Sequence, residues 1–128
     1  TQEMLDFGNA VIDQMKKRIA QAHTIYDQAA PPLSKSYLER PKGKHFYGNT
    51  STIRDLNRSG RMLRSIKVIA VNQNRAIIYL TDQKMIERMS HNQRRAAQWG
   101  FSPSDRQFMI DYVRNFKLIK IEQTSKAA

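Results

Sequence analysis

The sequence contains no cysteine among its 128 residues. A disulfide framework, a thiolate nucleophile and a cysteine-based zinc site are therefore excluded, and the chain can assemble in a reducing compartment. Long hydrophobic runs are missing too, since no apolar stretch approaches the roughly 20 residues that a membrane-spanning helix needs. The first residues lack the basic-then-apolar pattern of a secretory signal, so we expect a cytoplasmic product.

Residues that carry catalysis are scarce. The histidines His23, His45 and His91 are scattered, and no two of them stand at the spacing of metal ligands. There is no glycine-rich phosphate loop and no nucleophile motif. Asp55 and Asp82 could act as paired carboxylates only if the fold brought them together. We therefore expect a protein that is not an enzyme and that uses no metal or cofactor.

Positive charge is what the sequence has in excess. There are 22 Lys and Arg against 11 Asp and Glu, a net charge of +11, which attracts polyanions and acidic protein surfaces. Residues 35–67 alone hold nine basic and two acidic residues. This basic segment supplies the candidates for a surface that faces DNA or another protein: Lys42, Lys44, Phe46, Tyr47, Arg54, Arg58, Arg61 and Arg64.

The four arginines of this set recur at three- and four-residue steps, which would align them on one face of a helix. Like charges in a row are tolerated best beside an anionic partner, and guanidinium groups can grip phosphate or carboxylate in bidentate fashion. The alternative is a solvated surface on which Asp55 and other acids pair with the arginines.

Hydrophobic periodicity predicts three helices. The first runs from about residue 2 to 29 and is stopped by Pro31 and Pro32; its apolar stripe is Met4, Phe7, Val11, Met15, Ile19, Ala22 and Tyr26, and its polar face carries Asp6, Asp13, Lys16, Lys17 and Arg18. A second covers residues 83–98 and is ended by Gly100. A third starts at Ser102-Pro103-Ser104-Asp105, and its buried stripe is predicted to be Phe108, Met109, Tyr112, Val113 and Phe116.

Two β-rich runs, 66–71 and 76–81, flank a polar four-residue turn and predict a hairpin. The alternating segment 118–122 is expected to join it as a third strand, and the third helix is expected to pack on the hairpin side formed by Val68, Ala70, Ile77 or Tyr79. The predicted fold class is α+β: a long N-terminal helix, a small antiparallel sheet (the hairpin plus a C-terminal strand) and two further helices. We expect one domain over residues 1–128, with a mobile basic loop at about 42–53.

Five residues are expected to shape the scaffold. Gly60 permits a tight or left-handed turn that aims the nearby arginines. The segment containing Trp99, Gly100, Ser102 and Asp105 combines a helix stop with a new helix start, so it fixes the angle between two helices.

Three motifs in a fixed order carry a family resemblance: PPLSKSYLER (31–40), RDLNRSGRMLRSI (54–66) and RRAAQWGFSPSDRQFM (94–109), with the hairpin between the last two. Together they resemble the phage virion morphogenesis family, the tail-completion proteins of Mu-like and other contractile-tailed phages. The resemblance covers about residues 30–115 and rests on motif order and spacing.

The resemblance implies a structural virion protein of the phage neck or tail end, which completes or terminates the tail and helps to join it to the head. It implies a homo-oligomeric ring, a hexamer by analogy with the sixfold tail, that contacts neighbouring neck, tail-tube or connector proteins and lumen DNA without sequence preference, and no membrane. The protein would be assembled in the host cytoplasm and would reside in the virion. The alternative is a nucleic-acid-binding module without sequence preference.

Overall fold

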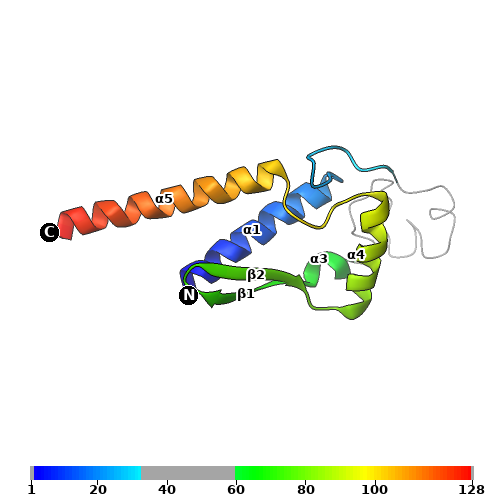
Figure 1. Ribbon diagram of the computed structural model, residues 1–128, viewed down its shortest axis with the longest axis horizontal. Coiled ribbons are helices and arrows are strands. Elements are labelled where there is room, and N and C mark those ends of the chain that lie inside the picture. The colour runs from blue at the N-terminus through cyan, green and yellow to red at the C-terminus, as the bar shows by residue number, and fades with distance from the viewer. Residues whose placement is uncertain (1, 33–59, 128) are drawn as a thin grey trace.

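The computed structural model describes residues 2–32 and 60–127, with side chains described as far as residue 115. Its elements are helix α1 (Gln2–Ala20), the short helix α3 (Arg61–Arg64), strands β1 (Ile66–Asn72) and β2 (Arg75–Leu80), and helices α4 (Gln83–Arg95) and α5 (Pro103–Ala127). The predicted α+β class is thus confirmed. Figure 1 shows the hairpin and α5 running alongside α1, with α4 across the end of the hairpin.

The hairpin forms where the two β-rich runs predicted it. Strands β1 and β2 are antiparallel, with Ile66 opposite Leu80 and Val68 opposite Ile78. Gln73 and Asn74 make the turn, and the Asn72 side chain accepts a hydrogen bond of 2.8 Å from the amide of Asn74. This contact stabilises the turn because the side-chain oxygen of Asn72 accepts the hydrogen bond that a backbone carbonyl would accept in an ordinary turn.

Helix α1 packs closely on one face of the hairpin. Its buried apolar residues are Val11, Ile12, Met15 and Ile19. Contact is tightest at Gly8, where an added Cβ would lie 2.5 Å from Cγ2 of Val68. A glycine is needed here because any side chain would push the helix away from the strand.

The first helix is shorter than predicted, ending at Ala20 and not near residue 29. Its end is a hydrogen-bonded reversal in which the amide of Ala22 donates to the carbonyl of Ile19 (2.8 Å) and the amide of His23 to that of Arg18 (3.1 Å). Ala22 adopts a left-handed conformation with φ 57°, the arrangement usually made by glycine. The apolar period continues past residue 20 because Ala22 is still buried, although in a turn.

The expected C-terminal strand is wrong. Residues 118–122 belong to α5, and the sheet has two strands. Neither glycine nor proline occurs from residue 104 to 127, so nothing interrupts the helix once it has started. Extending a helix adds one backbone hydrogen bond per residue, which outweighs a five-residue β pattern without a neighbouring strand to pair with.

Helix α5 packs against α1, and the predicted packing on the hairpin is wrong. The ring of Tyr112 lies 5.2 Å from that of Phe7 and 6.2 Å from that of Phe108. Burial, with a contribution from the charge of Asp6, raises the pKa of the Tyr112 hydroxyl. Two side chains of the expected partner surface, Ile77 and Tyr79, face solvent instead.

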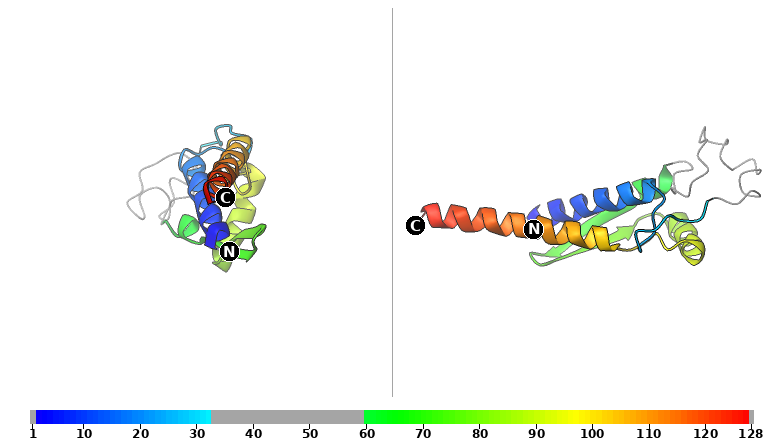
Figure 2. Two further views of the ribbon diagram at one scale, coloured as in Figure 1. Left: turned by 90° about the vertical axis from the view of Figure 1, so that its left-hand side faces the viewer. Right: turned by 90° about the horizontal axis from the view of Figure 1, so that it is seen from above.

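A second small core forms where α3, the hairpin and α4 meet. Met62, Met85 and Met89 are buried together, with Leu80 and Trp99 packed against them. Helix α4 ends at Arg95, a few residues earlier than predicted, because Ala96 is extended. The segment from Ala96 to Ser102 then runs back to the C-terminal end of α1, where α5 begins, as Figure 2 shows from two further directions.

Candidate functional site

Most of the predicted basic surface falls outside the described residues. This applies to Lys42, Lys44, Phe46, Tyr47, Arg54 and Arg58, and to the loop expected to be mobile at about 42–53, so those remain predictions. The structure places Arg61 and Arg64 in α3, and both are exposed. Gly60 precedes this helix with φ 77°, which confirms the expected left-handed turn.

Arg61 forms an ion pair that was not predicted from the sequence. Its Nε donates a hydrogen bond to Oδ2 of Asp82, and the two side chains are 47% and 22% exposed. Asp82 also caps α4 by accepting a hydrogen bond of 3.1 Å from the amide of Lys84. The bond from Arg61 lowers the pKa of the Asp82 carboxyl. Arg61 therefore pairs with an acidic residue of its own chain, which was the alternative interpretation of the four arginines. The partner is Asp82 and not Asp55.

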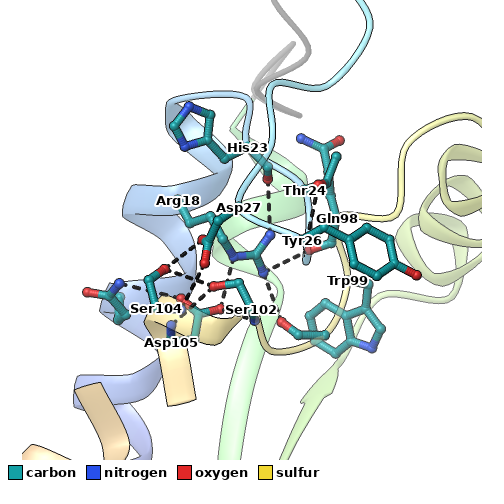
Figure 3. A network of polar contacts seen from close by, with 12 residues as sticks. Arg18, His23, Thr24, Tyr26, Asp27, Gln98, Trp99, Ser102, Ser104 and Asp105 are labelled. Carbon is teal, nitrogen blue, oxygen red and sulfur yellow. Dashed lines mark hydrogen bonds and ion pairs between the residues drawn. The ribbon is translucent and has the colours of Figure 1, made fainter. Parts of the chain in front are cut away.

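The strongest polar arrangement among the described residues is buried. Nε of Arg18 donates to Oδ2 of Asp105 at 2.9 Å, and these side chains are only 2% and 0% exposed. Figure 3 shows the guanidinium surrounded by oxygen acceptors. Its remaining nitrogens donate to three backbone carbonyls, those of His23 (3.1 Å), Gln98 (3.0 Å) and Gly100 (2.8 Å).

The prediction that Arg18 lies on the polar face of the first helix is therefore wrong, because Arg18 is a buried cross-link. A planar guanidinium has five N–H donors in fixed directions, so it can hold a carboxylate and several carbonyls at once. Here it joins the end of α1 to the turn at His23, to the segment before α5 and to α5 itself. We call Arg18, Asp105 and the groups bonded to them the polar hub.

Asp105 bonds to Ser102 through both its carboxylate and its backbone amide. Its Oδ2 accepts from the amide of Ser102 (3.0 Å), while Oγ of Ser102 accepts from the amide of Asp105 (3.1 Å). This reciprocal pair is a capping box, which satisfies amides at the start of a helix that have no intrahelical partner. The predicted helix start is confirmed, and the same carboxylate also neutralises Arg18.

Gly100 and Trp99 shape the segment that enters the polar hub. Gly100 has φ 138°, and an added Cβ would lie 3.2 Å from Ile25, so both backbone and space favour glycine. The side-chain oxygen of Gln93 accepts from the amide of Trp99 (3.0 Å), and its NH2 group donates to the Trp99 carbonyl (2.9 Å). Both residues thus position the backbone, as expected.

Further buried polar groups extend the polar hub to α4. The side-chain nitrogen of Asn92 donates to the side-chain oxygen of Gln98 (2.8 Å) and to the carbonyl of Ala96 (3.2 Å). Asn92 and Gln98 are both buried. Sequence reasoning missed these two residues and Arg18. The available signal was that Arg18 follows Val11 and Met15 at helical spacing, which places it on the buried stripe.

The turn after α1 is tied to α5 by Asp27. Its carboxylate accepts from the amide of Ser104 (2.8 Å) and from the Ser104 hydroxyl (2.6 Å). These bonds lower the pKa of Asp27, the hydroxyl contributing most. The same turn is joined to the segment before α5 because the amide of Ile25 donates to the carbonyl of Ala97 at 2.7 Å.

The polar hub is suited to holding elements together. Every buried side-chain nitrogen and oxygen atom in the described part of the chain has at least one hydrogen-bond partner, as expected for groups that join structural elements. Over the same residues, no three acidic or histidine side chains are grouped to hold a metal ion. Nor does any helix there combine the length and apolar character needed to cross a membrane.

Comparison with known proteins adds no relative: no protein-family model, curated protein or solved structure matches this sequence.

Proposed function

We propose that the chain is a structural subunit of a phage neck or tail end, which completes or terminates the tail and helps to join it to the head. In this proposal it forms a homo-oligomeric ring, with six copies by analogy with the tail. It then contacts neck, tail-tube or connector proteins and resides in the virion.

The observation that carries the proposal is the way buried and exposed groups are divided. The buried polar groups cross-link the elements, whereas apolar side chains remain exposed on the hairpin and on α5, including Ile77, Tyr79, Ile110 and Val113. Helix α5 also extends well past the ends of α1 and the hairpin (Figures 1 and 2). Exposed apolar surface and a projecting helix suit a subunit completed by its neighbours.

The motifs behind the resemblance support the same proposal. Gly60 sets a left-handed turn before the arginines of α3, and Ser102 with Asp105 starts α5 and fixes it to α1. These residues therefore have positions and contacts that shape a rigid body. A subunit that must present surfaces at fixed angles to its neighbours needs such a body.

A second candidate is a nucleic-acid-binding module without sequence preference. The net charge of +11 and the exposure of Arg61 and Arg64 favour it. Binding by such a module depends on counterion release, so its affinity falls steeply as salt rises. A neck subunit that lines the lumen could contact DNA in the same way, but deleting that subunit would stop particle assembly.

The experiment is genetic complementation of the phage that encodes the chain. With the gene interrupted, electron microscopy should show filled heads and separate tails, and the chain supplied from a plasmid should restore joined particles. Joined, infectious particles without the chain would rule the proposal out. If the purified chain also bound DNA with a steep salt dependence, the second candidate would replace it.

A further inference from the structure

The hairpin has a second face, directed away from α1. Because side chains alternate across a strand, the residues on this face are Lys67, Ile69, Arg75, Ile77 and Tyr79. Asn72 joins them because it pairs with Arg75 after a register shift that follows Ala70. We call this set the outer hairpin surface. Its three apolar members remain exposed, with Ile69 at 47%, Ile77 at 38% and Tyr79 at 36%, and Val71, at the register shift, is 48% exposed.

The register makes these residues one patch. Ile69 pairs with Ile77 and Lys67 with Tyr79 across the two strands. Directly opposed residues have Cβ atoms about 4.5–5.5 Å apart, so the two isoleucines touch side by side with the tyrosine ring next to them. Single exposed apolar residues are common on proteins, but a contiguous group of three such residues indicates an interaction surface.

The strand sequences have the pattern of strands covered on both faces. Residues 76–80 of β2 are Ala-Ile-Ile-Tyr-Leu, without a polar interruption. A hairpin with one face in water normally alternates apolar and polar residues, whereas strands covered on both sides are apolar throughout. Helix α1 covers one face (Figure 1), so the pattern calls for a second layer on the other.

Charge indicates which kind of partner would suit the outer hairpin surface. The two ionised members of the outer hairpin surface, Lys67 and Arg75, are both basic, and the surface includes no acid. Stacking two copies of it would bring four cations together in a protein of net charge +11, which opposes self-pairing. A segment with acidic residues beside its apolar stripe is complementary in both respects.

We propose that the outer hairpin surface docks an acidic amphipathic helix of a different protein. Its apolar stripe covers Ile69, Ile77 and Tyr79, and its carboxylates pair with Lys67 and Arg75. This arrangement repeats on the outer face the helix–sheet packing that α1 makes on the inner face. The inference goes beyond the proposed function, because it follows from this surface alone and holds whether or not the chain belongs to a virion.

The test uses the full chain and two synthetic helical peptides with the same leucine stripe. One peptide carries Glu beside the stripe and the other carries Lys. Backbone NMR of the labelled chain should show saturable shifts at residues 67–71 and 75–79 with the Glu peptide, with affinity falling as salt rises. The Lys peptide should bind at least about tenfold more weakly.

Two variants locate the binding. Ile77→Thr keeps a strand-forming residue and should weaken the Glu peptide about tenfold or more. Ile86→Gln removes an isoleucine of similar exposure from α4 and should leave binding unchanged. Equal affinity for both peptides, no binding of either, or shifts confined to other elements would overturn the proposal. So would a concentration-dependent self-association that Ile77→Thr abolishes, because the occupant would then be a second copy.

Discussion

Arg18 and Asp105 stand 87 residues apart in the sequence, yet Nε of the arginine lies 2.9 Å from Oδ2 of the carboxylate in a place closed to water. Each side chain holds backbone as well as its partner. Arg18 binds three carbonyls, and Asp105 accepts from the amide of Ser102, the residue just before α5. The angle between α1 and α5 therefore depends on this pair.

Replacing Asp105 by Asn should strongly destabilise the fold. Asparagine preserves the size of the side chain but leaves the Arg18 guanidinium buried without a counter-charge. We expect the free energy of unfolding to fall by about 3–5 kcal/mol, measured by urea denaturation. Asp111→Asn on the exposed side of the same helix is the control, and it should change stability by less than about 0.5 kcal/mol. Equal effects of the two substitutions would show that the buried pair does not stabilise the fold.

Local signals predicted much of this fold. The hairpin, the start of α5 and the turn at Gly60 could be predicted because each depends on residues close in sequence. The polar hub was not, since Arg18 and Asp105 meet only through tertiary packing. The helix end at Ala20 was missed because Ala22 takes a left-handed conformation that glycine usually signals. The strand expected at 118–122 failed because local alternation says nothing about whether a partner strand is near.

The contact of Asp27 with Ser104 should respond to acid. The pKa of Asp27 is lower in the folded chain than its usual value of 3.8. The contact therefore stabilises the fold fully above pH 3.8, and this stabilisation is lost as pH falls through the folded pKa of Asp27. Carboxyl NMR should therefore give Asp27 a titration midpoint below 3.8. In Ser104→Ala, which removes the largest cause, the midpoint should rise. An Asp27 midpoint that is the same in both proteins would contradict the contact.

Gly8→Ala should destabilise the chain although alanine is the better helix former. Helix propensity alone favours alanine by about 1 kcal/mol. The new methyl group would meet both Cγ atoms and Cβ of Val68, at 2.5–3.3 Å, so rotating the valine does not relieve the overlap. We expect overpacking, which costs about 1–3 kcal/mol, to outweigh that gain and to lower the melting temperature.

A double-mutant cycle separates that overlap from other effects. Val68→Ala removes both Cγ atoms, including the one that would lie nearest the new methyl group, so the substitution Gly8→Ala should cost less in that background, with a coupling of at least about 0.5 kcal/mol. Strict additivity would mean that α1 does not approach β1 at this point.

Arg61 and Arg64 should respond differently to substitution, although both are exposed in α3. Arg61→Gln breaks the bond to Asp82 beside the cap of α4 and should lower the melting temperature. Arg64→Gln should leave the melting temperature unchanged but reduce head–tail joining or DNA retention. Arg64→Lys should restore part of that function, because lysine returns the positive charge but not the planar guanidinium group. Normal particle yield from Arg64→Gln would remove this arginine from the proposed interface.

The mass of the purified full chain in solution tests the proposed ring most directly. Light scattering during size-exclusion chromatography should give a discrete multiple of the chain mass, six by analogy with the tail, that persists on dilution. The contrary result is a single-chain mass at every concentration, with DNA affinity that falls steeply as salt rises and no restoration of head–tail joining. That outcome would contradict a structural neck subunit and favour a nucleic-acid-binding module.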